Sequence, residues 1–260
     1  MPTCTACNFR SQKAKMMSER SVLSISGDDH VSFLQGLVTN DVTKADEAII
    51  YTALLTPQGK FIADFFVIGQ QDHLLIDVAA SHAQTLAQRL MMYRLRAAVV
   101  IEQTDLIVSR GTGPKPAGAL GDPRHEAMGW RAYGETDISD DTHWDALRVA
   151  NLIPQTGVEL TDDTYILEAG FEALNGVDFR KGCFVGQEIV ARMKHKTVLK
   201  KGLAQVAING NATPGDAITA DGKPAGTLYT VSGDKALAFL RFDRAIGEMQ
   251  AGDATLTRLK

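Results

Sequence analysis

Two apolar runs on either side of a four-residue turn constrain the fold of this chain most strongly. The runs cover residues 48–55 and 61–68, and Thr56-Pro57-Gln58-Gly59 lies between them. Proline in the second position and glycine in the fourth are typical of a type I β-turn. Apolar runs of strand length around such a turn predict a β-hairpin. We therefore expect an antiparallel pair of strands at 48–55 and 61–68.

Strand and helix patterns alternate around this hairpin. Residues 21–25 alternate apolar and polar side chains, which predicts a strand. An amphipathic helix with Val31, Leu34 and Val38 on one face is expected to follow and to end near Asn40. Residues 111–123 hold four glycines and three prolines, which predicts a loop or an internal linker. The other patterns up to residue 152 predict strands at 73–78, 97–102, 106–109 and 128–133 and helices at 81–94 and 142–152.

The C-terminal part of the chain has a different character. Short apolar runs at 203–208, 216–219, 226–231 and 235–242 are separated by glycine and proline. Short strands at regular spacing are typical of a small barrel or sandwich. The predicted fold class is therefore α+β, with a mixed body over residues 18–197 and a small C-terminal β-barrel over residues 198–260.

The composition excludes several classes of partner. The 260 residues are 45% hydrophobic and 22% charged, close to the average for globular chains. A net charge of −4 gives no overall attraction to nucleic acid or to an anionic membrane. No apolar run approaches the ~20 residues that a membrane-spanning helix needs. We expect no membrane partner and no direct nucleic-acid binding.

The cysteines bear on the compartment. Three are too few for a disulfide framework, which indicates a reducing environment, and no apolar secretory signal precedes the first strand. Together these observations predict a cytoplasmic protein. Cys4 and Cys7 form a C-x-x-C pair, but no second pair completes a four-thiolate site, so no metal site is expected. The pair lies in a basic segment, residues 1–17, which has the composition of a flexible leader or of a short mitochondrial-type presequence.

The third cysteine, Cys183, lies in the octapeptide that runs from Lys181 to Glu188. It lies between Gly182 and Gly186, and glycines allow tight turns and close approach of the backbone. A nearby lysine favours the thiolate, which is the form that reacts or binds metal. A helix that starts near Gln187 would stabilise that anion further. The alternative is a buried, inert cysteine, because free cysteine is among the most buried residue types.

Three segments of the chain together resemble the YgfZ-type folate-binding proteins. These are relatives of the glycine-cleavage T-protein, an aminomethyltransferase, and of the mitochondrial iron–sulfur assembly factor in the same family. The segments read FLQGLVTNDV from Phe33, PQGK from Pro57 and KGCFVGQE from Lys181, and the last is the most specific. The resemblance implies an aminomethyltransferase-like folate-binding body with a C-terminal β-barrel. It also implies a tetrahydrofolate-dependent role in assembling or repairing iron–sulfur clusters of client enzymes, including some that modify tRNA.

Comparison with T-proteins argues against aminomethyl transfer. T-proteins carry an acidic pair where this chain has Ala63 and Asp64, and a pterin-contacting glutamate where it has Ala150. A methyl group cannot accept the hydrogen bonds that a carboxylate offers to a pterin. T-proteins also tend to carry aspartate where this chain has Cys183. The resemblance therefore implies that a thiol has replaced the acids that serve one-carbon transfer.

Cys183 is the predicted functional residue. Lys181, Gly182, Phe184, Gly186, Gln187 and Glu188 are its expected motif support, although Lys181 and Glu188 are equally consistent with a surface ion pair. The predicted folate-binding residues are Asp64, Tyr93, Arg94, Arg96 and Arg148, because a carboxylate suits the pterin and arginines suit the glutamate tail. A satisfied core carboxylate at Asp64 and charge compensation at a helix end by the arginines are the alternatives.

The function expected from these residues is that of a folate-binding accessory protein in iron–sulfur cluster maturation, with iron–sulfur client proteins as partners. One cysteine cannot hold a cluster alone, because stable clusters normally have four protein ligands. A tetrahydrofolate-dependent aminomethyltransferase or demethylase is the enzymatic alternative, and a pure binding module that recruits tRNA-modifying enzymes is the third. Whether any reaction is catalysed is left open. The basic stretch 192–201 is interpreted as a solvated face.

Overall fold

The computed structural model describes residues 19–196 and 198–259, and the expected leader over residues 1–17 lies outside this range. The body is built on a five-stranded sheet in which every neighbouring pair is antiparallel. The strand order is β2-β3-β4-β1-β5, with β1 at Arg20–Ser26, β2 at Ile50–Leu55, β3 at Phe61–Gly69, β4 at His73–Ala79 and β5 at Val100–Gln103. The predicted hairpin is confirmed as β2 and β3, and Gly59 N–H donates to the Thr56 carbonyl at its turn.

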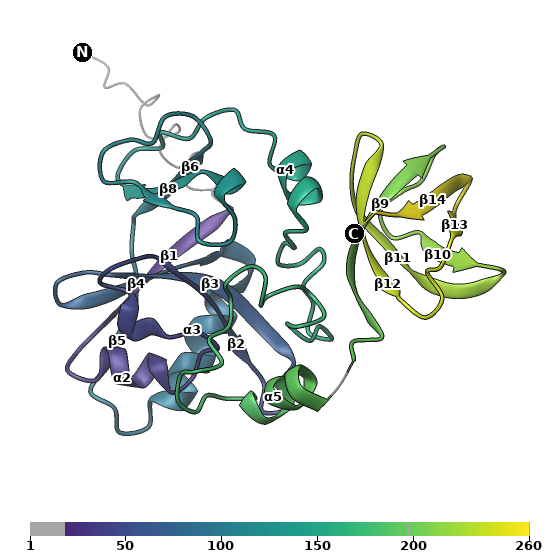
Figure 1. Cartoon of the computed structure of the whole chain (residues 1–260). Helices are drawn as coiled ribbons and strands as arrows, with labels where there is room; N and C mark the ends of the chain where they lie inside the picture. The colour runs from purple at the N-terminus through teal and green to yellow at the C-terminus, as the bar shows by residue number, and fades with distance from the viewer. Residues whose placement is uncertain (1–18, 197, 260) are drawn as a thin grey trace, which may run out of the picture.

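The two faces of this sheet bury two separate cores, because successive side chains of a strand point to opposite sides. Leu54, Ala63 and Phe65 belong to one core, which α2 (His30–Gln35) and α3 (Ala80–Arg94) cover. Tyr51 and Phe66 belong to the other core, which faces the rest of the body. Figure 1 shows the two helices below the sheet and the second sheet above it.

The second sheet has three strands in the order β6-β8-β7, namely β6 (Ile107–Gly111), β7 (Leu120–Gly121) and β8 (Trp130–Gly134). The glycine- and proline-rich stretch 111–123 runs from the end of β6 through a loop and includes β7, all within one sheet, so it is not a linker between domains. A 3₁₀ turn, η2 (Glu126–Met128), precedes β8, and α4 (Trp144–Asn151) follows it. This layer packs on the Tyr51 face of the five-stranded sheet.

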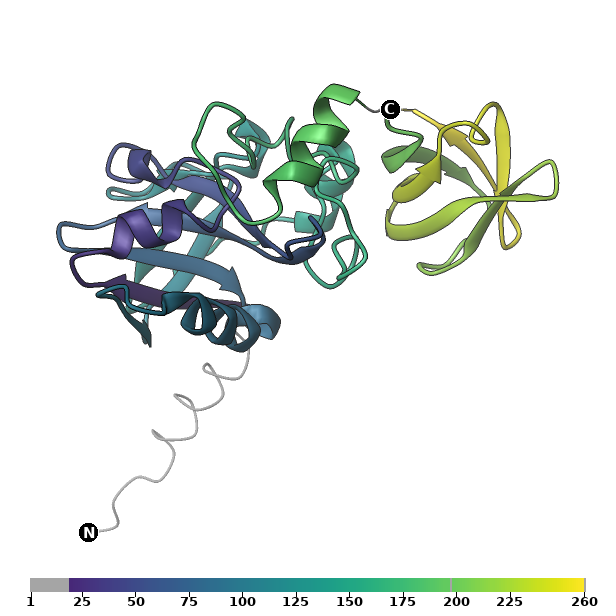
Figure 2. The same cartoon turned by 90° about the horizontal axis from the view of Figure 1, so that it is seen from below.

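The C-terminal part is a closed six-stranded barrel in the order β10-β11-β12-β9-β14-β13. Its strands are β9 (Lys201–Asn209), β10 (Ala217–Ala220), β11 (Lys223–Ser232), β12 (Lys235–Arg241), β13 (Glu248–Ala251) and β14 (Ala254–Arg258). Figures 1 and 2 show the barrel beside the body, on the α4 side. The barrel is tied to the body by Gln205, whose amide Nε2 donates to the Val149 carbonyl at 2.7 Å.

The helix predicted to end near Asn40 is shorter than expected. It ends at Gln35, and a single 3₁₀ turn, η1 (Val42–Lys44), follows after an irregular stretch. Val38, which was expected on the apolar face of the helix, instead forms a bridge with Leu54. The apolar spacing correctly indicated burial, because Leu34 and Val38 lie in the same core. The helix is shorter because Val38 pairs with Leu54 and does not continue the helix.

Candidate functional site

The three segments that carry the family resemblance meet at one place in the structure. Lys181 makes the first connection: its buried ammonium donates to the carbonyls of Gln35 (2.7 Å), Val38 and Asn40 (3.1 Å). These carbonyls lie at the end of α2 and just after it, where backbone oxygens lack helical partners. Burial lowers the pKa of Lys181 to about 8, but this value is still above neutral pH, so the amine remains largely charged there. Lys181 thus fastens the octapeptide to the stretch after α2.

Gly186 makes the second connection, to the hairpin turn. Its φ is +83°, and a Cβ there would lie 2.7 Å from the Thr56 carbonyl oxygen and 3.1 Å from the Gly59 Cα. Gly59 has φ +75°, and a Cβ there would lie 2.8 Å from the Ile189 Cβ. Both positions therefore need glycine for conformation and for space. The two glycines let the octapeptide lie directly against the hairpin turn.

Between these two connections the chain exposes the thiol. Phe184 is buried in the core on the Tyr51 face, whereas Cys183 is exposed. Gly182 is exposed as well, and a Cβ at this position would touch nothing within 4 Å. The alternative of a buried, inert cysteine is therefore wrong for Cys183. The octapeptide presents the thiol to solvent from a segment anchored on both sides.

The remaining motif residues belong to α5 (Gln187–Lys196), which starts four residues after the thiol. Gln187 is half-buried and Glu188 is exposed in the first turn. The ammonium group of Lys181 donates to backbone carbonyls, so the alternative of a surface ion pair does not hold for Lys181. The basic residues of α5 lie toward its C-terminal end, where Lys194 pairs with Glu172.

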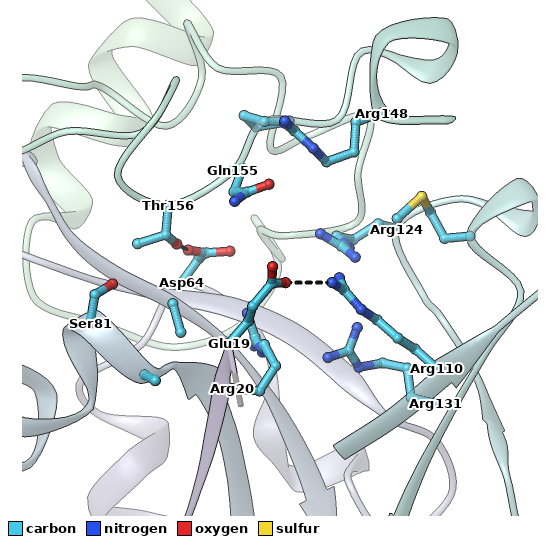
Figure 3. Close-up of a pocket in the computed structure, with 14 residues that line it drawn as sticks. Glu19, Arg20, Asp64, Ser81, Arg110, Arg124, Arg131, Arg148, Gln155 and Thr156 are labelled. Atoms are coloured by element: carbon cyan, nitrogen blue, oxygen red, sulfur yellow. Dashed lines mark hydrogen bonds and ion pairs between the residues drawn. The ribbon is translucent and has the colours of Figure 1, made fainter. Parts of the chain in front are cut away.

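A separate pocket opens on the Tyr51 face of the five-stranded sheet, with a volume of about 280 Å³. Figure 3 shows arginines gathered on one side of it and Asp64, Thr156 and Ser81 on the other. Of the predicted site residues, Asp64 and Arg148 line this pocket, and Cys183 does not. The pocket walls are Glu19, Arg20, Asp64, Ala79, Ala80, Ser81, Arg110, Arg124, Met128, Arg131, Arg148, Pro154, Gln155 and Thr156.

Asp64 is held by two hydroxyl groups. It is almost fully buried, and it accepts hydrogen bonds from the Tyr51 hydroxyl (2.9 Å) and the Thr156 hydroxyl. The neighbouring Ala63 belongs to the core under α2 and α3, because it points to the opposite face of β3. An acid at position 63 would therefore not reach the pocket. The replacement of an acid by Ala63 therefore carries no information about what the pocket binds.

Arg148 has partners in both parts of the chain. Its Nη1 lies 3.0 Å from Glu159, and its Nη2 donates to Asp145 (3.0 Å) and to the hydroxyl of Thr230 (2.8 Å), which is on the barrel strand β11. Its Nε is buried and has no acceptor. Ala150, which matches the pterin-contacting glutamate of T-proteins, is exposed and does not line the pocket.

The other predicted folate ligands lie outside the pocket. Arg94 and Arg96 are exposed at the C-terminal end of α3, and Tyr93 packs partly against the core under that helix. Arg94 makes a long contact, 3.5 Å, to the Val99 carbonyl. The N-terminal end of α3, at Ala80 and Ser81, is the end that lines the pocket. The structure therefore does not bring these three residues together with Asp64.

Sequence reasoning missed most of the pocket arginines. Arg131 is fully buried, with Nη2 at 2.5 Å from Asp77, and Asp77 also accepts from Arg20 Nε at 2.6 Å. Burial alone would raise the pKa of Asp77, but Arg131 and Arg20 hold it below its usual value. Arg124 pairs with Asp122 at 2.7 Å, which lowers the pKa of that carboxyl to about 2 against the effect of burial. The sequence does hold one signal of these buried pairs, namely a charged residue within an otherwise apolar strand, as at Asp77 and Arg131.

Comparison with known proteins supports the fold directly. The structure matches that of the glycine cleavage system aminomethyltransferase T from Bartonella henselae with a TM-score of 0.75, covering 94% of this chain and 83% of that one at 12% identity. Residues 200–260 match the family model of the CAF17 C-terminal β-barrel domain. The body therefore has an aminomethyltransferase-like fold and the C-terminal part is a β-barrel, as predicted, and the family model identifies this barrel as the CAF17 type.

The curated relatives are iron–sulfur cluster assembly factors. The chain is 26% identical to human iron–sulfur cluster assembly factor IBA57, covering 88% of this chain and 78% of that protein. It is 29% and 30% identical to the IBA57 homologues of Neurospora crassa and Mycosarcoma maydis. It spans 54% and 61% of the lengths of these two fungal proteins.

All of these relatives are named as mitochondrial proteins. The prediction of a cytoplasmic protein was therefore wrong. Its basis was the small number of cysteines, which indicates a reducing environment but does not distinguish one such compartment from another. None of the helices in the described part of the chain is long and apolar enough to cross a membrane.

Proposed function

We propose that this chain is an iron–sulfur cluster assembly factor of the IBA57 kind, in which the Cys183 thiolate contacts iron of a cluster during its delivery to a client protein. The cluster is the cargo and not a resident cofactor. The observation that carries the proposal is the exposure of Cys183 within a segment anchored through Lys181 and Gly186. The similarity to IBA57 proteins supports the same function.

The anchoring matters for chemistry because a ligand that is already in place loses little conformational freedom when iron binds. Lys181 and Gly186 fix the backbone on both sides of the thiol, so Cys183 has mainly its own side-chain rotation to lose. To bind iron the thiol must release its proton, because the thiolate is the ligand. The exposed position allows both the proton and an incoming partner to reach the sulfur.

A partner must supply the other ligands. Within residues 19–196 and 198–259, no group of three or more His, Cys, Asp and Glu side chains is placed to hold a metal ion. Protein-bound clusters normally have four ligands. We therefore propose that Cys183 contributes one ligand in a complex with the client, a second copy of the chain or a small thiol. Clients that modify tRNA are part of this proposal, and they follow from the resemblance alone.

Tetrahydrofolate is the ligand that the resemblance implies, and the pocket does not fit it well. Both oxygens of Asp64 already accept hydrogen bonds, and the three residues expected around the glutamate tail lie elsewhere. A volume of about 280 Å³ is at the lower limit for pockets that enclose drug-sized ligands. Folate binding therefore stays a prediction from the resemblance, and no step of the proposed function depends on it.

The proposal is tested by cluster binding in the presence and absence of a client apoprotein. The chain is mixed with a client, ferrous iron and sulfide under anaerobic conditions, and the visible absorption of the cluster is followed in the mixture and in each protein alone. We expect Cys183→Ser to abolish the absorption that appears only in the mixture. The control is Thr85→Ala, which changes an exposed side chain of α3 that does not line the pocket and is remote in sequence from the octapeptide. Equal cluster formation with Cys183→Ser and with the unchanged chain would contradict a ligand role.

The enzymatic alternative has its own test. An assay with tetrahydrofolate and aminomethyl donors measures one-carbon turnover directly. We expect no turnover. Clear turnover that survives Cys183→Ala would favour the transferase or demethylase reading over the assembly factor. A pure recruiting module differs again, because it predicts that cluster delivery to the client survives Cys183→Ser.

A further inference from the structure

We propose that the arginine-lined pocket binds a compact anion that carries two or more negative charges, either a small polycarboxylate or a phosphate. The anion would lie between Arg110, Arg124, Arg148 and the N-terminal end of α3. This site is distinct from the exposed thiol, because Cys183 does not line the pocket. The inference goes beyond the iron–sulfur role and does not depend on it.

The distribution of charge is the first argument. Five arginines line the pocket, while three of the carboxylates that pair with them, those of Asp77, Asp122 and Glu159, are buried behind its walls. Asp64 and Glu19 are the acids among the lining residues, and the Glu19 side chain is 72% exposed. The surface that a ligand would meet is therefore more positive than the total number of charges suggests.

Arg110 shows the effect of this excess charge. It lies directly opposite Arg131 in the β6–β8 pairing, and like charges in such positions repel. Burial together with the neighbouring Arg131, Arg20 and Arg124 lowers the pKa of Arg110 to about 10, although Glu19 pairs with it at 2.7 Å. An anion bound beside Arg110 would relieve this repulsion.

Unused hydrogen-bond donors are the second argument. The Nε of Arg148 is buried without an acceptor, which is costly unless a ligand or water completes it. Arg124 donates hydrogen bonds to Asp122 through Nε and Nη2, and its Nη1 makes no hydrogen bond to any described residue. The guanidinium group of Arg110 donates one hydrogen bond, from Nη2 to Glu19, among the described residues. These guanidinium groups thus offer charge-assisted donors, which carboxylates and phosphates accept best.

The N-terminal end of α3 adds to the same field. This 15-residue helix begins beside the pocket, and its N-cap residue, Ala79, has no side chain that can accept from the first turn. Ala80 N–H donates to the Glu19 carbonyl, and the amides that follow it have no partner inside the helix. Helix N-termini favour anions through these amides and the helix dipole.

The size and the polarity of the pocket select the class of ligand. A volume of about 280 Å³ holds a compact anion and leaves little space for a fused-ring system with an attached tail. Its apolar walls are limited to Ala79, Ala80, Met128 and Pro154, which give little surface for stacking an aromatic ring. A polyanion with few apolar atoms therefore matches the pocket better than an extended aromatic ligand.

Isothermal titration calorimetry on the full chain at low ionic strength tests the proposal, with citrate, inorganic phosphate, acetate and tetrahydrofolate as probes. We expect saturable 1:1 binding of citrate or of phosphate, which distinguishes the two sources of the charge, with weaker binding of acetate. Affinity should fall as salt rises, because screening weakens charge interactions. Absence of binding by both citrate and phosphate would overturn the proposal. So would tetrahydrofolate binding that neither anion displaces.

Three variants locate the binding in the pocket. Arg110→Gln should lower the affinity for the anion by about tenfold or more, which is the loss expected for one hydrogen bond to a charged group. Its partner Glu19 is exposed, so this variant leaves no buried carboxylate unpaired. Glu19→Gln should strengthen binding, because it removes the competing charge. Arg89→Gln, on the exposed side of α3, is the control and should leave the affinity unchanged.

The opposite responses of Arg110→Gln and Glu19→Gln separate a ligand role from a structural one, since a loss of folding would weaken binding in both. Circular-dichroism melting of each variant checks that the fold is retained. Unchanged affinity in Arg110→Gln with a native melting curve would overturn the proposal. The readout does not involve the thiol, so its failure leaves the proposed cluster role standing.

Discussion

Replacing Gly186 by alanine should loosen the octapeptide and leave the rest of the fold intact. Gly186 has φ +83°, and its missing Cβ would lie 2.7 Å from the Thr56 carbonyl oxygen and 3.1 Å from the Gly59 Cα. Both neighbours are backbone atoms, which cannot turn away as a flexible side chain can. The change therefore adds a strained backbone conformation and an overlap with the hairpin turn.

The expected cost follows from these two terms. A left-handed backbone conformation costs an alanine about 1–2 kcal/mol, and an extra methyl group in a filled space costs about 1–3 kcal/mol. The sum, about 2–5 kcal/mol, is a large part of the stability of a typical domain. Gly182→Ala is the matched control within the same motif, because no atom lies within 4 Å of its missing Cβ and its φ is not positive. Its effect should stay within about 0.5 kcal/mol.

Urea unfolding followed by circular dichroism measures the free-energy change of both variants. The rate at which iodoacetamide alkylates Cys183 reports on the local segment, and it should change in Gly186→Ala and stay constant in Gly182→Ala. If the two variants lose equal stability, or if Gly186→Ala is neutral, the close packing of the octapeptide on the hairpin turn is not what holds the thiol in place.

Three further expectations concern the buried charges. Asp77→Asn should lower the free energy of unfolding by about 3–5 kcal/mol in urea titrations, because Arg131 and Arg20 lose the buried carboxylate that they share and Arg131 keeps only Asp122, at 3.3 Å. A change below 1 kcal/mol, on the order of an exposed pair, would contradict this. Asp122 has a folded pKa of about 2, below its unfolded value. Its contribution to the free energy of unfolding is therefore complete above about pH 4 and is lost as pH falls toward 2. A melting temperature that does not change over this interval would be inconsistent with the buried pair. Thr230→Val should cost about 1–3 kcal/mol by removing the hydroxyl that bonds Glu159 (2.5 Å) and Arg148, and calorimetry should then show the barrel and the body unfolding less cooperatively; a single unshifted transition would argue against this link.

The architecture was predictable because it rests on local patterns. The hairpin follows from Pro57 and Gly59 between two apolar runs, and the structure confirms it. Strands β13 and β14 were missed, although burial alternates over residues 248–251 and 254–256 in the way that a period-two pattern predicts. The helix at Val31 was predicted too long, because apolar spacing cannot distinguish a helical Val38 from one that pairs with Leu54 across the fold.

The site was predictable only where one segment carries it. The octapeptide could be recognised as a unit, but its anchoring depends on carbonyls near residue 38, more than 140 positions away, and on the hairpin turn. Arg94 and Arg96 were chosen for their position after a helix, yet the other end of that helix lines the pocket. The arginine cluster joins β1, β6 and β8, and no local pattern indicates that these strands bring their charges together.

The proposed role of the exposed Cys183 thiol is in iron–sulfur cluster assembly. It is tested most directly in a strain that lacks its own homologue, by measuring the activity of cluster-dependent enzymes after the chain or its Cys183→Ala variant is supplied. We expect the unchanged chain to restore these activities, and the variant, at equal protein level, to leave them near the level of the deficient strain. Full restoration by Cys183→Ala would contradict this role.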